Sequence, residues 1–136
     1  MRVIALDIGD VRIGVAMSDF LGMLASPLEV IDRNKCNAVE RIKKIVEENK
    51  VETVVAGLPK SLNGEEKVQA EKVRAFVKLL EEALNKEIVF IDERYSTVAA
   101  DRMLKETTKK NAIEKRKVVD KIAATYILQT YLDMKR

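Results

Sequence analysis

The sequence predicts an α/β domain in which helices cover the faces of a mixed β-sheet. The chain opens with three short β-prone runs, its apolar residues change to a helical period after Asn34, and apolar runs of strand length then alternate with helices. Because a strand–helix–strand crossover leaves its two strands parallel, the first, fourth and fifth strands should form a parallel centre beside an antiparallel opening pair. With 136 residues and no linker-like stretch, we expect one domain over residues 1–136.

The first three strands are expected at Arg2 to Leu6, Arg12 to Met17 and Leu24 to Ile31. Gly9 and Asp10 supply turn chemistry between the first two strands, which should therefore form a hairpin. Asp7 closes the first of them. Pro27 has no amide hydrogen to donate within a central strand, so the third strand should lie at an edge of the sheet.

The remaining elements follow the change of period. We expect four helices: from about Asn34 onward, over Glu65 to Asn85, from Ser96 or Thr97 to Lys105, and over Val118 to Met134. Two further strands are expected over Val51 to Ala56 and Glu87 to Ile91, and a polar loop at Lys60 to Gly64. The run from Glu87 is apolar enough for a strand that is buried on both faces. In the last helix, the expected buried stripe consists of Val119, Ile122, Ala123, Tyr126, Ile127 and Tyr131.

Composition excludes several classes of protein. With 47% hydrophobic and 35% charged residues, the chain fits neither a disordered nor a low-complexity class. No apolar run approaches the roughly 18 residues of a membrane helix, so we expect a cytoplasmic protein without a targeting segment. The absence of histidine excludes Ser-His-Asp and Cys-His catalysis and histidine-held zinc. The single cysteine, Cys36, is expected within a helix as an inert small residue.

Four acidic residues occupy positions where charge is unexpected. Asp7 follows the first strand, Asp92 and Glu93 follow the fifth, and Asp120 lies beside the apolar stripe of the last helix. Ligand sites of open sheets lie at the carboxyl ends of parallel strands, so we expect Asp7 and the Asp92–Glu93 pair at one pocket. Carboxylates without histidine suit Mg²⁺ or Mn²⁺, and such ions can activate water for phosphodiester hydrolysis. Each acid could instead be a turn residue, a salt-bridge partner or a solvated helix residue.

Basic residues are unevenly distributed around a net charge of +3. The segment from Lys105 to Lys117 contains six basic residues and two acidic ones, although such a run can also be an ordinary solvated face. The candidate phosphate contacts are Arg12, Lys60, Ser61, Asn63, Arg94 and Lys115 to Lys117. Aromatic residues make up only 4% of the chain, which argues against a base-stacking platform. Gly9 and Gly14 complete neither a dinucleotide fingerprint nor a Walker loop.

Four segments together resemble the YqgF/RuvX family: ALDIGDVRIGVAMSD, GLPKSLNGEEKVQAEKVRAF, DERYSTVAADRML and DKIAATYILQTYL. They occur in the family's order and span nearly the whole chain. The resemblance implies a ribonuclease H-like fold with strand order 3-2-1-4-5. It also implies that Asp7, Glu93 and Asp120 bind a catalytic Mg²⁺ or Mn²⁺. Asp10 departs from the small or neutral residue that is more usual in the family, and it adds negative charge near this site.

Members of the family act as Holliday junction resolvases or as nucleases that process the 5′ end of pre-16S rRNA. By this resemblance we expect a metal-dependent endonuclease of structured RNA that functions in ribosome biogenesis, with ribosomal particles as further partners. Arg12, Lys60, Arg94 and Arg116 would hold the nucleic-acid backbone. Three alternatives remain open: a DNA junction resolvase with the same site, a non-catalytic nucleic-acid-binding module, and one half of an ATP-binding protein of the kinase and actin type.

Overall fold

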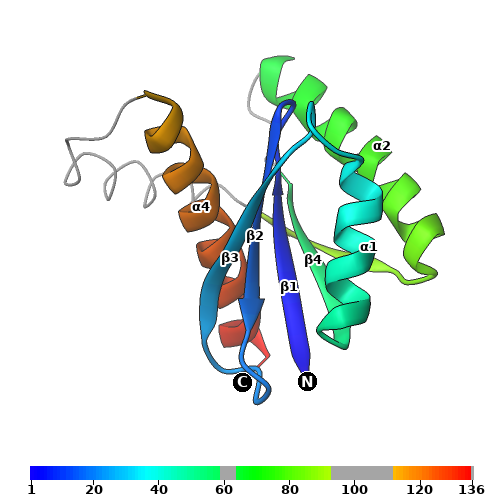
Figure 1. Cartoon of the computed structure of the whole chain (residues 1–136), viewed down its shortest axis with the longest axis vertical. Helices are drawn as coiled ribbons and strands as arrows, with labels where there is room; N and C mark the ends of the chain where they lie inside the picture. Colours follow the sequence, from blue (N-terminus) through cyan, green and yellow to red (C-terminus); the bar gives the residue numbers. More distant parts are fainter. Residues whose placement is uncertain (59–63, 93–111, 136) are drawn as a thin grey trace.

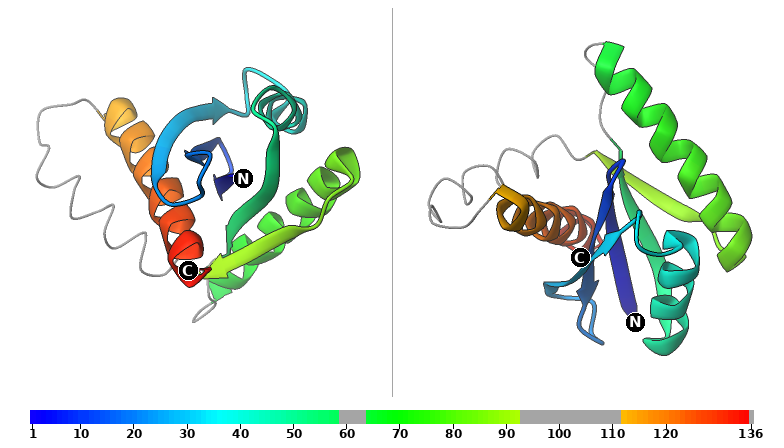
Figure 2. Two further views of the ribbon diagram at one scale, coloured as in Figure 1. Left: turned by 90° about the horizontal axis from the view of Figure 1, so that it is seen from below. Right: turned by 45° about the horizontal axis from the view of Figure 1, so that its top comes forward.

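The structure is a five-stranded mixed sheet with helices on both faces (Figure 1), as predicted. This computed structural model describes residues 1–58, 64–92 and 112–135. Its elements are β1 (Arg2–Ile8), β2 (Arg12–Ser18), β3 (Ala25–Asp32), α1 (Ala38–Glu48), β4 (Val51–Leu58), α2 (Gly64–Leu84), β5 (Ile88–Asp92) and α4 (Ala112–Met134). Helices α1 and α2 cover one face and α4 covers the other, as both views of Figure 2 show. No helix within these residues is long and apolar enough to cross a membrane.

The strand order is β3-β2-β1-β4-β5, which confirms the expected arrangement. Strands β1, β4 and β5 are parallel, whereas β2 is antiparallel to both β1 and β3. Strand β3 lies at an edge, as Pro27 predicted. The ladder continues through Asp7 to Ile8 in β1 and through Gly57 to Leu58 in β4, because main-chain pairing does not stop where the apolar run stops.

Two layers of core hold the helices to the sheet. Ile4, Leu6 and Ile8 of β1 pack in the layer beneath α1 and α2. Val3 and Ala5 alternate with them and pack in the layer beneath α4. Asp7 continues that alternation, so its side chain lies on the α4 face of the sheet.

Two expectations about buried surfaces are wrong. Strand β5 is not buried on both faces: Val89 and Phe90 are 38% and 39% exposed, because among the described strands β5 is at the edge of the sheet and pairs only with β4. In α4, Tyr126 is 38% exposed, whereas Ala124 and Leu128 are fully buried. The helix therefore presents a slightly rotated face to the sheet, which its evenly apolar sequence did not distinguish.

Two helix boundaries also differ from expectation. Helix α4 begins at Ala112 rather than Val118, so the backbone of Arg116 is helical. Cys36 is exposed and precedes α1, which starts at Ala38 because the side chain of Asn37 caps it by accepting a hydrogen bond from the Glu40 amide. The expected short helix from Ser96 or Thr97 to Lys105, and most of the loop that begins at Lys60, lie outside the described residues.

Candidate active site

The candidate site begins at the carboxyl end of β1. Asp7 is partly buried there and pairs across the hairpin with Gly14 of β2. Residues paired across an antiparallel ladder point to the same face, so the Gly14 position also faces α4. Glycine leaves this position without a side chain directly beside Asp7, and the helix can approach the sheet there.

Helix α4 uses that space. A Cβ atom placed on Gly14 would lie 2.1 Å from the main-chain oxygen and 3.2 Å from the Cβ atom of Asp120. The main chain of α4 at Asp120 is therefore seated directly on β2, next to the strand position of Asp7. Two acids from opposite ends of the chain share one face of the sheet, at the level where β1 ends.

Asp120 is held by an arginine from the start of β2. The Arg12 Nε atom donates to Asp120 Oδ2 over 2.9 Å, and both side chains are about one-fifth exposed. Burial raises the pKa of the Asp120 carboxyl, and the hydrogen bond and positive charge of Arg12 act in the opposite direction. A carboxylate in this environment requires a cation beside it, and Arg12 provides one.

The turn that carries Arg12 is fixed from several directions. The Gly9 amide donates to the Arg12 carbonyl over 2.9 Å and closes the hairpin. Arg33 holds the other side of the turn: its amide donates to the Val11 carbonyl over 2.8 Å, and its guanidinium donates to the Gly9 carbonyl over 2.7 Å. This network positions the backbone of Arg12, whereas the direction of its side chain depends on its rotamer.

Asp10 does not point into this face. Its carboxylate lies 3.5 Å from the Lys72 ammonium of α2, and both side chains are more than half exposed. Because α2 covers the opposite face of the sheet from α4, the extra negative charge of Asp10 is directed away from Asp7 and Asp120. The departure at this position is thus accommodated by an ion pair with α2.

Asp92 also lies on the other face. It pairs with Leu58, whose side chain packs against the core beneath α1 and α2. Its predecessor Ile91 packs beneath α4 and pairs with Gly57. The alternation along β5 therefore assigns Asp92 to the face of the sheet opposite Asp7. Glu93 itself lies outside the described residues.

The remaining predicted site residues are only partly covered. Lys60 and Arg94 lie outside the described residues, as do Ser61 and Asn63, and the side chain of Arg116 is likewise not described. Within the described ranges, no three His, Cys, Asp or Glu side chains gather closely enough to bind a metal ion. The binding roles assigned to these residues and to the acidic triad therefore stay predictions.

Two features of the site were not anticipated from the sequence. Arg12 was expected to contact phosphate, but in the structure it pairs with Asp120. Gly14 was considered only as a member of a nucleotide-binding fingerprint, yet it is a point of very close approach between α4 and the sheet. A partial signal was present in RIGVA, where an arginine and a glycine stand on the same face of an apolar run, although this pattern does not identify Asp120 as the partner.

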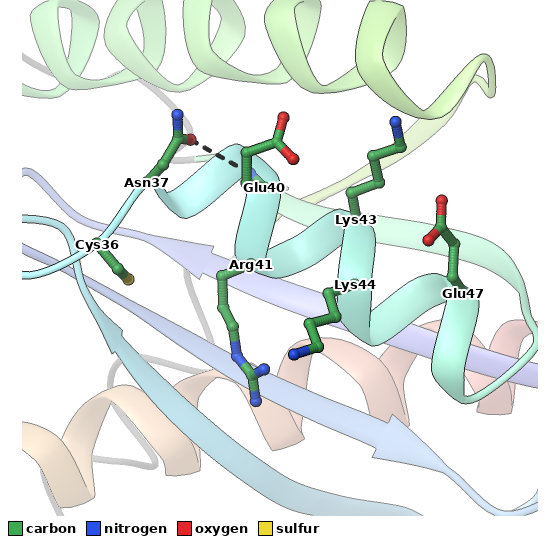
Figure 3. Close-up of a pocket in the computed structure, with 7 residues that line it drawn as sticks. All are labelled: Cys36, Asn37, Glu40, Arg41, Lys43, Lys44 and Glu47. Carbon is green, nitrogen blue, oxygen red and sulfur yellow. Dashed lines mark hydrogen bonds between the residues drawn. The ribbon is translucent and has the colours of Figure 1, made fainter.

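Two of the hollows on the described surface can be compared with the candidate site, and neither is lined by Asp7 or Asp120. One, of about 510 Å³, is lined by residues of α1 and the segment just before it (Figure 3). Arg41 and Lys44 project to one side of the helix, and Glu40 and Lys43 project to the other. Its charges are mixed, and Arg41 is already paired with Glu29. The other, of about 620 Å³, is apolar and lies at the far end of α4; its lining includes Met1, Leu21, Met23, Tyr131 and Leu132. Neither brings acidic side chains together.

The RuvX family model, described as "Holliday junction resolvase", matches residues 1–134. This chain belongs to the RuvX family. A protein of Fusobacterium nucleatum named "Putative pre-16S rRNA nuclease" is 64% identical over 136 residues, which covers 99% of both chains. A Clostridium botulinum protein of the same name is 48% identical over 98% of this chain and 97% of its own. The similarity thus extends over the whole length of each protein.

Solved structures support the fold of this RuvX member. RuvC of T. thermophilus, in complex with a Holliday junction substrate, superposes with a TM-score of 0.60 at 13% identity over 99% of this chain and 95% of its own. The Fowlpox virus resolvase with Holliday junction DNA gives a TM-score of 0.59 at 14% identity over 99% of each chain. These likenesses confirm the ribonuclease H-like fold. The family description and the names of the relatives denote nucleases, so the expected enzyme class, a phosphodiester hydrolase, is also confirmed.

Proposed function

We propose that this RuvX member is a metal-dependent endonuclease that cleaves pre-16S rRNA at its 5′ end, within a single catalytic domain over residues 1–136. The observation that carries the proposal is the seating of Asp120 against Gly14, the strand partner of Asp7. It brings two acids to one face of the sheet from positions near opposite ends of the chain. The names of the full-length relatives support the RNA substrate.

The acids of this face fit a hard divalent cation. Asp7 and Asp120 offer carboxylate oxygens, which Mg²⁺ and Mn²⁺ prefer, and the chain contains no histidine that would favour zinc. Partial burial of both residues strengthens their attraction to a cation. Asp7 and Asp120, with Glu93 as the third member, would hold the ion. When bound, such an ion supplies a water of lowered pKa and neutralises charge on the phosphate.

The chain's own basic residues would hold the substrate. Arg12 stands directly beside Asp120, and a guanidinium can donate two parallel hydrogen bonds to a phosphate. Lys60, Arg94 and Arg116 complete the proposed set of backbone contacts. Binding through phosphates and helix shape suits a chain with few aromatic residues. We place the activity in the cytoplasm, on ribosomal precursor particles.

The test is cleavage of a pre-16S rRNA 5′ fragment by the purified protein, with and without Mn²⁺. The Asp7→Asn variant keeps the shape of the side chain and removes one ligand charge, so cleavage should fall at least 100-fold while circular dichroism is unchanged. Asp10→Asn is the matched control: the same change, three residues away, on the α2 side, should leave cleavage within about twofold of wild type. Full cleavage by Asp7→Asn would remove Asp7 from the mechanism.

A four-way DNA junction is the second substrate to compare. The description of the family and the junction complexes of two structural neighbours favour it, and the phosphodiester chemistry is the same for both substrates. Metal-dependent cleavage of the junction but not of the RNA would assign the enzyme to DNA recombination. Salt-sensitive binding of either nucleic acid without any cleavage would instead identify a non-catalytic binding module.

A further inference from the structure

The ion pair between Arg12 and Asp120 occupies one of the proposed metal ligands. The Arg12 Nε atom lies 2.9 Å from Asp120 Oδ2, so this oxygen already accepts a strong hydrogen bond from a positive group. The proposed ion would need a carboxylate oxygen of the same residue. A guanidinium and a divalent cation at one carboxylate repel each other, and partial burial of the pair leaves little solvent to screen that repulsion.

The geometry allows Asp120 to stay in place while Arg12 leaves. The main chain at Asp120 rests against Gly14, and α4 is anchored farther along by fully buried Ala124 and Ile127, so the backbone of Asp120 cannot withdraw without moving the helix. Arg12 has its backbone fixed in the hairpin turn, but its long side chain can swing by changing rotamers. Of the two partners, Arg12 has the longer side chain and therefore the greater reach toward other groups.

Resting on the function proposed above, we propose that Arg12 is an exchangeable counter-ion of the active site. In the metal-free protein it neutralises Asp120 and keeps this partly buried carboxylate from standing unpaired. With a divalent cation bound, Asp120 would serve as one of its ligands, and the guanidinium of Arg12 would be released to donate hydrogen bonds to a substrate phosphate. Metal loading is thereby coupled to phosphate binding, because the same arginine is unavailable to phosphate until the metal displaces it.

The contrary role is that of a fixed positioning residue. In that role Arg12 would remain hydrogen-bonded to Asp120 and orient it toward the metal, as outer-shell partners commonly do. The two roles predict opposite changes in metal affinity when the guanidinium is removed. A competing counter-ion weakens metal binding, so its loss strengthens the affinity, whereas loss of an orienting partner lowers it.

The experiment is a Mn²⁺ titration of the metal-free proteins by isothermal calorimetry. Arg12→Gln should bind Mn²⁺ about five- to tenfold more tightly than wild type, and Mn²⁺ should raise its melting temperature by more. Arg41→Gln is the matched control, because it breaks an arginine–carboxylate pair on the other face of the sheet and should leave Mn²⁺ affinity unchanged. If Arg12→Gln does not fold, Arg12→Met repeats the measurement with a side chain of similar length. Weaker Mn²⁺ binding by the Arg12 variant would overturn the proposal.

A second titration tests the released arginine, with adenosine 5′-monophosphate as the phosphate probe. Mn²⁺ should strengthen binding of this nucleotide to wild type, and Arg12→Gln should lose most of that gain. An equal gain in both proteins would overturn the coupling to phosphate. If wild type binds no Mn²⁺ at all, the proposed metal-dependent function itself fails. If wild type binds Mn²⁺ and the Arg12 variant binds it more weakly, only the counter-ion proposal fails.

Discussion

Substituting Gly14 with alanine should separate α4 from the sheet at the candidate site. The new methyl carbon would lie 2.1 Å from the main-chain oxygen of Asp120, and ordinary van der Waals contact begins near 3.4 Å, so the helix must recede by about 1.3 Å at this point. The obstacle is backbone rather than a flexible side chain, and no rotamer change relieves it. Movement of the helix away from the sheet is unfavourable, because it would expose Ala124, Ile127 and Leu128 of α4, which are fully buried.

The expected cost follows from that geometry. Forcing an extra methyl group into a close-packed contact destabilises proteins by roughly 1–3 kcal/mol, and a backbone clash belongs at the upper end, so we expect about 3 kcal/mol for Gly14→Ala. A displacement of about 1 Å at catalytic groups can lower rates by on the order of 100-fold. We therefore expect cleavage to fall about 100-fold at a temperature where the variant remains folded.

Urea denaturation and RNA cleavage should be measured together on Gly14→Ala and on Gly22→Ala. Gly22 has a φ of 69°, and a Cβ atom there would lie in ordinary van der Waals contact with the Met1 main-chain oxygen at 3.5 Å, so alanine costs roughly 1–2 kcal/mol through backbone strain alone. It lies in the β2–β3 turn, so cleavage should be retained. Wild-type stability and cleavage in Gly14→Ala would refute the claim that close approach of Asp120 to β2 builds the site.

Two further predictions concern the layers around the site. Leu128→Ala should lower the free energy of unfolding by about 3 kcal/mol, because Leu128 is fully buried between α4 and the sheet. The control is Leu79→Ala, at a position 58% exposed, which should change the free energy of unfolding by less than about 1 kcal/mol. Equal urea midpoints for the two variants would contradict this packing. In the β2–β3 turn, the hydrogen bond from the Met23 amide, 2.8 Å long, lowers the pKa of the Asp19 carboxyl below 3.8. The stability that this bond contributes is present above the unfolded-state pKa and is lost as pH falls through the folded-state value, so an NMR titration of Asp19 with a midpoint at or above 3.8 would disprove it.

Much of the fold could be predicted because turn residues and local hydrophobic spacing indicate where strands and helices form. Gly9 and Asp10 indicated the first hairpin, Pro27 indicated an edge strand, and the aliphatic spacing of Ile42, Ile45 and Val46 indicated the buried side of α1. Strand order followed from crossover rules and family resemblance. The errors occurred where burial depends on neighbouring elements, as at β5, whose apolar sequence does not reveal its place at the edge of the described sheet.

The candidate site was less predictable. The acid types and the absence of histidine pointed to a hard-cation site, and alternation along β1 assigned Asp7 to one face once the core was known. Nothing in the spacing of Arg12 and Asp120 indicates that they pair, because 108 residues separate them. Their meeting depends on the angle at which α4 crosses the sheet and on the missing side chain at Gly14.

By itself, the sequence determined which chemistry is available: carboxylates, guanidinium groups and ammonium groups without imidazole, arranged in an α/β order of strands and helices. Composition and local periodicity are sufficient for that, since each depends on residues near one another in the chain. Only the tertiary structure decided that Asp10 and Asp92 turn away from Asp7, and that Arg12 neutralises Asp120. Those outcomes depend on which face of a sheet a side chain occupies and on what packs there, and both are set by contacts between segments far apart in the sequence.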